Sequence, residues 1–328
     1  MAARGTGTVA AVHVIGAGPA GSAAALAARA EGARVSIAEN ARLPRHKVCG
    51  EFLSPGVQAA LERLGVWREF LAQGPAPIRR FVLHVGRTEK RGRFPECGWG
   101  LSRYALDGFL HARAVAAGAA LGPGEEGARV VVASGRRAER PRGGRLFGFK
   151  AHFEGPADDA VEMFFCAGWY AGVSPVEGGA TNVCGIASEE LLAAHDFRFD
   201  ELVGGAAPLA RRLAPLSRKM KWLACGPVVF TPPGGAWRAR EYPAGDALAF
   251  IDPFTGTGML NALLTGRMAG VAAARGTPEA RYLAECRGLL ATPFRFAPLI
   301  RGVLGGGHAA ELARLVPARL LFRLTRPR

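Results

Sequence analysis

The sequence predicts an α/β protein with a parallel sheet in its first domain and an antiparallel sheet in its second. A β-branched run at residues 12–15 leads straight into a glycine-rich turn. An alanine-rich segment at 22–30 favours a helix, and a second strand-like run at 34–38 completes a βαβ unit. Beyond residue 149 the pattern changes to alternating strands broken by Gly and Pro turns, which indicates the second sheet.

The first strand is expected to be buried on both faces, as is typical of parallel sheets. The turn after it carries Gly16, Gly18 and Gly21 in the spacing G-x-G-x-x-G. The first glycine allows a tight turn, the second lets the backbone approach a pyrophosphate, and the third lets helix and strand pack closely. The helix that follows offers free N–H groups and a positive dipole end to phosphates.

An acidic residue completes this unit. Glu39 ends the second strand 18 residues after Gly21, close to the roughly 20 at which a carboxylate accepts from a ribose hydroxyl. Strand, glycines, helix, strand and acid in this order predict a dinucleotide site. They do not decide which dinucleotide binds.

Composition limits the other classes of function. The chain has 328 residues, 49% of them hydrophobic and 21% charged, which is ordinary for a globular protein with one large or two medium domains. The net charge is +15, but the basic residues are scattered. The densest run comprises Arg136, Arg137, Arg140, Arg142 and Arg145. It lacks the interleaved aromatics of a base-stacking surface, so we expect no nucleic-acid partner.

Cysteine usage and hydropathy bear on location. Six cysteines are spread singly with no C-x-x-C pair, which predicts neither a disulfide framework nor a metal site and favours a reducing cytoplasm. No apolar run reaches the ~18 residues that span a bilayer. Peripheral membrane contact stays open, because the segment after Thr277 alternates aliphatics, aromatics and arginines. Its simpler interpretation is a set of helices capping the second domain.

A second glycine motif stands far downstream, in GDALAFIDPFTGTGMLNALLTG at 245–266. It resembles a motif of the FAD-dependent oxidoreductases that include para-hydroxybenzoate hydroxylase and the geranylgeranyl reductases. In that family the aspartate of a G-D pair is bonded to the ribityl or pyrophosphate region, and a P-x-x-G-x-G turn and helix lie beside the isoalloxazine. The resemblance implies FAD as the cofactor and assigns these roles to Gly245, Asp246, Pro253, Gly256 and Gly258. A helix N-terminus at Gly258 would also stabilise the negative charge of reduced flavin.

Two further stretches extend the resemblance. ARLPRHKVCGEFLSPG, from residue 41, is similar to the segment that brings basic residues to the cofactor. It implies that Arg45 and Lys47 are phosphate or flavin partners and that Cys49 and Gly50 border the ring; a plain buried thiol is the other interpretation of Cys49. LSRYALDGFL, from residue 101, resembles an R-x-x-L-D-x-x-L helix whose arginine, here Arg103, reaches FAD.

The strands at 149–187 are similar to the substrate-domain sheet of the reductase branch, where a Y-x-W-x-F-P element lines the pocket. Tyr170, Gly172, Ser174 and Pro175 stand in that pattern here, so the tryptophan is missing. Flavin-dependent halogenases carry two tryptophans there, which disfavours halogenation. We expect Tyr170 and Cys49 to line the reaction site, and we assign no general acid or base.

The chain departs from the family in two places. Ser134 stands where the family carries the aspartate of an A-D-G motif. The short segment GAALGPGEEGA, before that motif, leaves no room for the usual further strand and β-hairpin crossover. We therefore expect one strand at the adenine end of FAD to be absent and the affinity for FAD to be reduced.

The resemblance implies a Rossmann-like FAD-binding domain with an inserted antiparallel-sheet substrate domain and a C-terminal helical segment. The predicted limits are 1–75, 98–140 and 240–275 for the FAD-binding domain, 76–97 and 141–239 for the substrate domain, and 276–328 for the helical cap. The implied function is an FAD-dependent oxidoreductase acting on a lipophilic or aromatic, isoprenoid- or polyketide-like substrate, with NAD(P)H as electron donor. Hydroxylation and double-bond reduction both remain open.

Two alternatives remain beside this function. One is a flavin-fold protein that has weakened or lost FAD binding and serves as a binding or scaffold partner. The other is a nicotinamide-only dehydrogenase, in which Asp246 would have no role.

Overall fold

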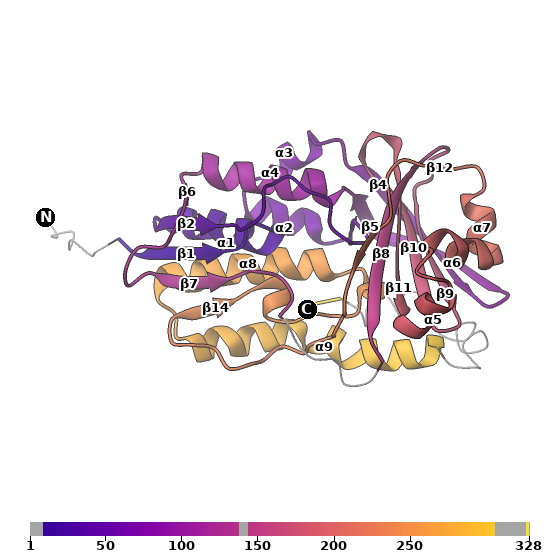
Figure 1. Ribbon diagram of the computed structural model, residues 1–328. Helices are drawn as coiled ribbons and strands as arrows, with labels where there is room; N and C mark the ends of the chain where they lie inside the picture. The colour runs from indigo at the N-terminus through magenta and orange to yellow at the C-terminus, as the bar shows by residue number, and fades with distance from the viewer. Residues whose placement is uncertain (1–8, 138–143, 306–325, 328) are drawn as a thin grey trace, which may run out of the picture.

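The computed structural model describes residues 9–137, 144–305 and 326–327, and these residues form two sheets, shown in Figure 1. The first sheet has five strands in the order β14-β7-β1-β2-β6, and every pair in it is parallel. Its strands are β1 (Ala11–Ile15), β2 (Arg34–Ala38), β6 (Ala120–Leu121), β7 (Arg129–Val132) and β14 (Glu241–Pro243). The predicted α/β class is confirmed.

The predicted βαβ unit is present as β1, α1 (Pro19–Ala30) and β2. The expectation that β1 is buried on both faces is wrong. Val12 and Val14 are buried, whereas Ile15 is 37% exposed. Ile15 is the last residue before the glycine turn, and it opens onto the cavity described below.

Small residues bring α1 against α8 (Gly258–Arg275). A Cβ atom at Gly266 would lie 2.2 Å from the carbonyl oxygen of Ala20, and one at Gly270 would lie 2.1 Å from that of Ala24. Only glycine allows the two backbones to approach so closely. The helix that carries the downstream glycine motif is thereby held against the helix that carries the first one.

The expectation that no strand precedes β7 at this edge is wrong. After α4 (Arg103–Ala116), the two-residue strand β6 pairs in parallel with β2, Ser36 opposite Ala120 and Ile37 opposite Leu121. Residues 122–128 then lead to β7 without a hairpin. The edge strand is present but short, because only two backbone positions can reach β2 before the chain turns back.

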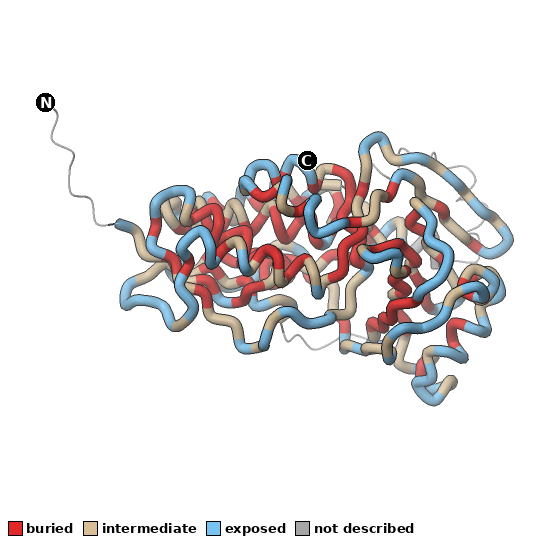
Figure 2. The backbone as a smooth tube through the Cα atoms, turned by 90° about the horizontal axis from the view of Figure 1, so that it is seen from above, coloured by how far each residue is buried: buried red, intermediate tan, exposed pale blue. Residues whose placement is uncertain are grey.

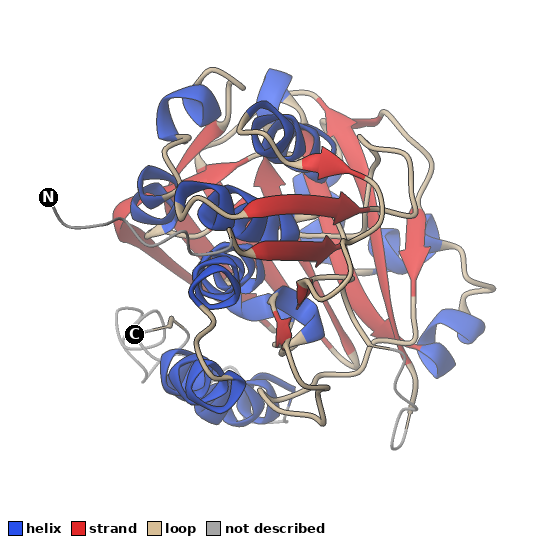
Figure 3. Cartoon of the chain, turned by 90° about the vertical axis from the view of Figure 1, so that its left-hand side faces the viewer, coloured by secondary structure: helices blue, strands red, loops and turns tan. Residues whose placement is uncertain are grey.

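The second sheet follows the order β12-β8-β11-β10-β9-β4-β5-β3, with β13 also paired to β8. Neighbouring strands are antiparallel except for β4 and β9. The strands are β3 (Phe52–Leu53), β4 (Ala76–Val85), β5 (Thr88–Gly100), β8 (Leu146–Glu154), β9 (Ala160–Cys166), β10 (Trp169–Pro175), β11 (Thr181–Ser188), β12 (Ser217–Arg218) and β13 (Leu223–Cys225). Figure 3 shows its long strands behind those of the first sheet. The sheet is mainly antiparallel, as predicted, and the domain limits stay a prediction.

The two faces of the second sheet differ because side chains alternate along a strand. Phe149, Ala151 and Phe153 on β8 point into a core that also contains residues of α5 (Glu189–Ala194), α6 (Phe199–Gly205) and α7 (Ala207–Leu213). The residues between them, Gly148, Lys150 and His152, belong to the opposite face. Figure 2 shows buried segments in both halves of the molecule.

The C-terminal segment begins with α9 (Glu279–Gly305), which contacts α8 and β14 of the first domain as well as β9 of the second sheet. The expectation of a cap on the second domain alone is therefore too narrow. The remaining helices are the short α2 (Val57–Arg63) and α3 (Trp67–Leu71). No described helix combines the length and the apolarity that a bilayer crossing requires. Arg140 and Arg142 of the arginine run lie outside the described residues.

Candidate functional site

A cavity of about 1110 Å³ lies where the two sheets meet. Its walls come from the first glycine turn, the segment 38–52, the start of α4, residues 133–136, one face of the second sheet and the segment 244–262. Every predicted site residue except Gly21 lines it: Gly16, Gly18, Glu39, Arg45, Lys47, Cys49, Gly50, Arg103, Tyr170, Asp246, Pro253, Gly256 and Gly258. Ser134 lines it as well.

Each of the three positions in the first turn is glycine for a different structural reason. Gly16 has φ +99°, and a Cβ atom there would lie 2.4 Å from the carbonyl oxygen of Ala133. A Cβ at Gly21 would lie 1.8 Å from the carbonyl oxygen of Gly16, so Gly21 packs the helix against the turn and does not reach the cavity. Gly18 is the N-cap of α1, with Pro19 following, and no side chain caps this helix end.

Two basic side chains stand in front of this helix end. A Cβ atom at Gly18 would lie 3.7 Å from Arg103 Nη2 and 3.9 Å from Lys47 Nζ. Both cations are held by Asp107, to which Lys47 donates at 2.8 Å and Arg103 donates twice, at 2.7 and 2.8 Å. The N-terminus of α1 and two fixed cations thus face the same space, which suits a diphosphate.

Asp107 is fully buried. Burial alone would raise the pKa of this carboxyl, but Arg103 and Lys47 outweigh it and hold the pKa below its ordinary value. Sequence reasoning missed this residue, although it is the aspartate of the R-x-x-L-D pattern. The i, i+4 spacing of Arg103 and Asp107 on a helix was the signal that could have found it.

Glu39 is held at the glycine turn by two backbone groups. Its Oε2 accepts from the N–H of Ala17 at 2.8 Å, and its Oε1 accepts from the N–H of Ala41 at 3.0 Å. Each carboxylate oxygen has a second lone pair. The carboxylate is therefore fixed in orientation and still able to accept from a hydroxyl in the cavity.

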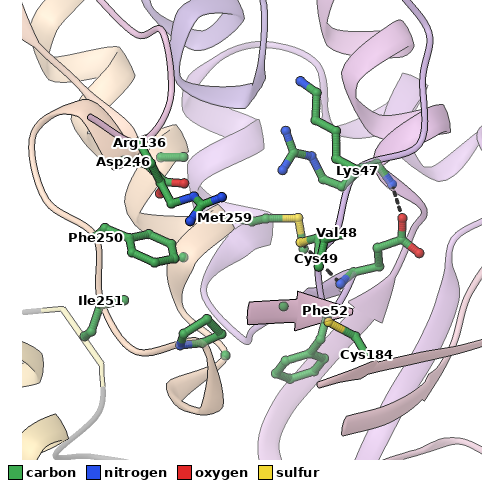
Figure 4. A pocket seen from close by; sticks show the side chains of 18 of the residues that line it. Lys47, Val48, Cys49, Phe52, Arg136, Cys184, Asp246, Phe250, Ile251 and Met259 are labelled. Carbon is green, nitrogen blue, oxygen red and sulfur yellow. Dashed lines mark hydrogen bonds between the residues drawn. The ribbon is translucent and has the colours of Figure 1, made fainter. Parts of the chain in front are cut away.

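Asp246 belongs to the short 3₁₀ turn η2 (Gly245–Ala247), and no described residue gives its carboxylate a hydrogen bond. Burial raises its pKa, while the charges of Arg103, Arg136 and Lys47 act in the opposite direction. Figure 4 shows Arg136 and Asp246 on one side of the cavity and Cys49 and Cys184 on the other. An unpartnered carboxylate at the cavity wall suits a ligand that donates hydroxyl groups.

The two distant glycine motifs share this one cavity. Gly245 has φ +59°, and a Cβ atom there would lie 2.8 Å from the Cβ of Ala20 in α1. In the second motif, Gly256 takes the left-handed conformation with φ +66° and leads into α8 at Gly258. A single elongated ligand can therefore reach both motifs.

The second sheet gives the cavity an apolar wall. Its side chains there come from β4, β5, β9 and β11 and include Phe81, Leu83, Phe94, Val161, Met163, Phe165 and Ile186. Tyr170 also lines this wall, and its hydroxyl donates to Asp252 Oδ1 at 2.7 Å. Burial and the Asp252 charge raise the pKa of Tyr170 well above its ordinary value. The Tyr170 ring therefore shapes the wall while its hydroxyl is already bonded.

Cys49 lines the cavity, as do the free thiols Cys184 and Cys225. The backbone N–H of Glu51 donates to Cys49 Sγ at 3.5 Å. Burial raises the pKa of Cys49, with Arg103 acting against this, and burial raises that of Cys184 further. Both side chains are therefore neutral thiols near neutral pH.

A buried charged cluster beside Cys49 escaped sequence reasoning. Glu51 and Lys150 are fully buried, and His152 is 8% exposed. Glu51 accepts from Lys150 Nζ and, at 2.6 Å, from the N–H of Arg103. The signal in the sequence was Lys150 and His152 two positions apart in an otherwise apolar strand, which places them on one face.

The residues present fit a flavin dinucleotide. The uncapped helix, Lys47 and Arg103 suit its pyrophosphate, and Glu39 and Asp246 suit ribose and ribityl hydroxyls. The remaining wall is apolar and suits a flat ring or a lipophilic molecule. The volume exceeds the roughly 300–1,000 Å³ of common small-molecule sites.

Known proteins resemble this chain in sequence and in fold. No protein-family model matches it. The digeranylgeranylglycerophospholipid reductase 1 of Methanopyrus kandleri is 31% identical over 318 residues, covering 82% of this chain and 81% of that protein. The menaquinone reductase of Mycolicibacterium smegmatis is 51% identical over 55 residues, and this match spans 17% of the chain and only 13% of the relative. Among solved structures, a flavin-dependent brominase superposes with a TM-score of 0.81 at 18% identity, covering 96% of this chain and 93% of that one, a likeness of fold.

Proposed function

Because this chain belongs to the FAD-dependent oxidoreductase family that includes the digeranylgeranylglycerophospholipid reductases, we propose that it binds FAD in the cavity and reduces a carbon–carbon double bond of a lipophilic, isoprenoid-like substrate. The observation that carries this proposal is the single cavity of about 1110 Å³. It joins a polar end built for a dinucleotide to an apolar wall on the second sheet.

Each side chain at the polar end of the cavity has its own role in the proposed binding of FAD. Lys47, Arg103 and the N-terminus of α1 bind the pyrophosphate, and the bonds to Asp107 fix both cations before the ligand arrives. Glu39 accepts from the adenosine ribose, and Asp246 accepts from a ribityl or ribose hydroxyl. The N-terminus of α8, opened by Gly256, faces the ring end and favours negative charge there.

When bound and reduced by the electron donor, FAD would supply the hydride that the substrate accepts. The protein's part is to orient the substrate and exclude water. The apolar wall contributes Phe81, Met163 and Phe165 to this, and the raised pKa values of Cys49 and Tyr170 leave both groups uncharged. An uncharged wall admits a hydrocarbon chain without burying an unpaired ion.

Reduction is preferred to hydroxylation because the relative that aligns along most of the chain is a reductase by name. A hydroxylase would act on an activated ring in the same cavity and would consume oxygen in step with the substrate. We also propose NAD(P)H as the electron donor and a cytoplasmic protein with peripheral membrane contact. Leu299 of α9 supports the last point, because it lines the cavity and is 62% exposed.

The experiment is to purify the protein, record its absorbance spectrum and add NADPH or NADH under argon. A yellow protein that bleaches on addition of NAD(P)H, and that adds two hydrogens per double bond to a polyprenyl lipid by mass spectrometry, supports the proposal. Oxygen uptake that depends on an aromatic substrate would replace it with hydroxylation. A colourless protein that takes up no added FAD would overturn it in favour of a scaffold.

A further inference from the structure

Glu51, His152 and His46 connect the cavity to the protein surface through titratable side chains. His46 is an exposed residue that also lines the cavity, and Glu51 lines it from a fully buried position. We propose that these three side chains deliver a proton from solvent to the reacting end of the cavity, with Lys150 fixing Glu51 in place. The purpose of this delivery rests on the proposed flavin function.

The contacts form a series with one gap, which lies between His46 and the bonded pair of His152 and Glu51. His152 Nε2 lies 2.6 Å from Glu51 Oε2, and Lys150 Nζ donates to Glu51 Oε1. The rings of His46 and His152 meet edge to face with centroids 5.3 Å apart. One nitrogen of each ring and a carboxylate oxygen of Glu51 all lie within 4.8 Å of one another. A rotation of the exposed His46 ring or one bridging water closes this gap.

The position of Glu51 ties the path to the cavity. Glu51 has φ +53°, which is uncommon for a residue with a side chain, and the surrounding bonds hold it there. It directly follows Cys49 and Gly50, which line the cavity. On the neighbouring strands, Lys150 lies opposite Cys184, another lining residue. Proton transfer through Glu51 therefore ends beside the predicted flavin ring.

The proposed reaction needs this proton. Saturating a double bond takes one hydride from the reduced flavin and one proton from another source, and it leaves oxidised flavin. Reaction of the same reduced flavin with oxygen has the same requirement, because FADH⁻, O₂ and one proton give FAD and H₂O₂. The hydrocarbon side chains of the apolar wall carry no exchangeable proton, so a side-chain path has a clear use.

Charges around the path set its direction. Several titratable or charged groups surround His46, Glu51 and His152. They are Lys150 on β8, Arg103 on α4, Cys49 in the 46–51 segment, Cys184 on β11 and Glu177 on η1 (Glu177–Gly179). Burial works against ionisation of Glu51, but its bond to His152 and the charge of Lys150 lower its pKa, so it stays a carboxylate. Burial and the nearby cations lower the pKa of His46. A proton taken up by His46 is therefore readily passed inward toward a fixed carboxylate.

The same three side chains have the composition of a metal site. Lys150 argues against a cation there, because its ammonium group already bonds Glu51 and would repel the ion. A metal would also compete with protons for the ring nitrogens, so it would block a proton path through them until acid released the ion.

The first test follows the seven histidines by ¹⁵N NMR during a pH titration of the protein, with His46→Ala and His152→Asn for assignment. Because charges on adjacent sites repel, removing His152 should raise the titration midpoint of His46. An unchanged midpoint, or a His46 ring that does not titrate until EDTA is added, would overturn the path. This measurement does not depend on bound FAD, so it stands if the flavin function fails.

The second test measures reoxidation of the reduced, FAD-loaded protein by oxygen, as H₂O₂ formed. His46→Ala should slow it at least about tenfold, toward the 10²-fold typical of lost acid–base catalysis. Added imidazole should restore the rate in proportion to its concentration. The matched control is His195→Ala at the end of α5, which should change nothing. An unchanged rate in His46→Ala, or a slow rate that imidazole cannot restore, would refute proton delivery.

Discussion

Gly172 on β10 lies directly opposite Cys184 on β11, and both residues line the cavity. The family pattern places a tryptophan at this position, so glycine removes a large side chain from the apolar wall. We expect Gly172→Trp to fill part of the cavity and to raise KM for a long lipophilic substrate by about tenfold or more, with FAD content unchanged. Steady-state kinetics with substrates of increasing length would show it.

The control for this variant is Gly172→Ala. A Cβ atom there would lie 3.2 Å from Met163 Sδ, which a flexible methionine can accommodate. The alanine variant should therefore keep both FAD and substrate binding. Equal effects of alanine and tryptophan would show that backbone freedom, not cavity volume, is the reason for the glycine.

We expect Asp107→Asn to lower the stability of the ligand-free protein and to increase the stabilisation that FAD provides. Asp107→Asn removes the negative charge that Lys47 and Arg103 share, so we expect a loss of about 3 kcal/mol in the free energy of unfolding without ligand. FAD brings a pyrophosphate to the same cations. Its addition should therefore raise the Tm of the variant more than that of the wild type, as thermal denaturation would report. Equal FAD-induced shifts would contradict the pyrophosphate placement.

The pKa of Asp107 also predicts a response to acid. Its pKa in the folded protein lies below the ordinary value of 3.8, so the unfolded chain binds the proton first. Its contribution to stability is therefore complete above about pH 4 and is lost as the pH falls through the folded pKa. In a comparison of urea unfolding between pH 7 and pH 3, the wild type should lose more stability than Asp107→Asn.

Substitution should have different effects at a glycine that prevents a backbone clash and at a glycine that only lines the cavity. A Cβ atom at Gly21 would meet the carbonyl oxygen of Gly16 at 1.8 Å, whereas nothing lies within 4 Å of one at Gly258. Gly21→Ala should therefore cost about 3 kcal/mol or more of folding free energy, since it forces helix and turn apart. Gly258→Ala should fold normally and lose affinity for FAD, because it changes only the cavity. Circular dichroism melting and FAD titration separate the two effects.

Local sequence patterns predicted the elements that carry their own signal. The β1–α1–β2 unit was recognisable because the glycine spacing, the alanine-rich helix and the end of β2 at Ala38 agree with one another. The strand β6 escaped prediction because two residues carry no periodicity, and only pairing with β2 makes them a strand. Ile15 was misjudged because its exposure depends on the cavity formed with the second sheet.

The candidate site shows the same limit. Motif spacing brought together Gly16, Arg103 and Asp246, which are far apart in the sequence and line one cavity. The pairing of Glu51 with Lys150 was not predicted, because the two residues are 99 positions apart in the sequence. They meet only because β8 packs beside the 46–51 segment. Buried charge pairs are set by tertiary structure, so a single sequence offers only an odd polar residue in an apolar strand as a clue.

Asp246 gives the sharpest test of the ligand's placement. Burial raises its pKa in the folded protein above the ordinary 3.8, so the folded state holds the proton longer than the unfolded chain. Its contribution to stability accordingly declines as the pH rises from about 4 through the folded pKa and stays low above it. Asp246→Asn removes this penalty, so the FAD-free variant should melt at a higher temperature than the wild type at pH 7. The same change loses a charged hydrogen bond to the ligand, which corresponds to a roughly 10- to 100-fold weaker affinity for FAD. A variant that melts higher and binds FAD as tightly as the wild type would place the hydroxyl groups of the ligand elsewhere in the cavity.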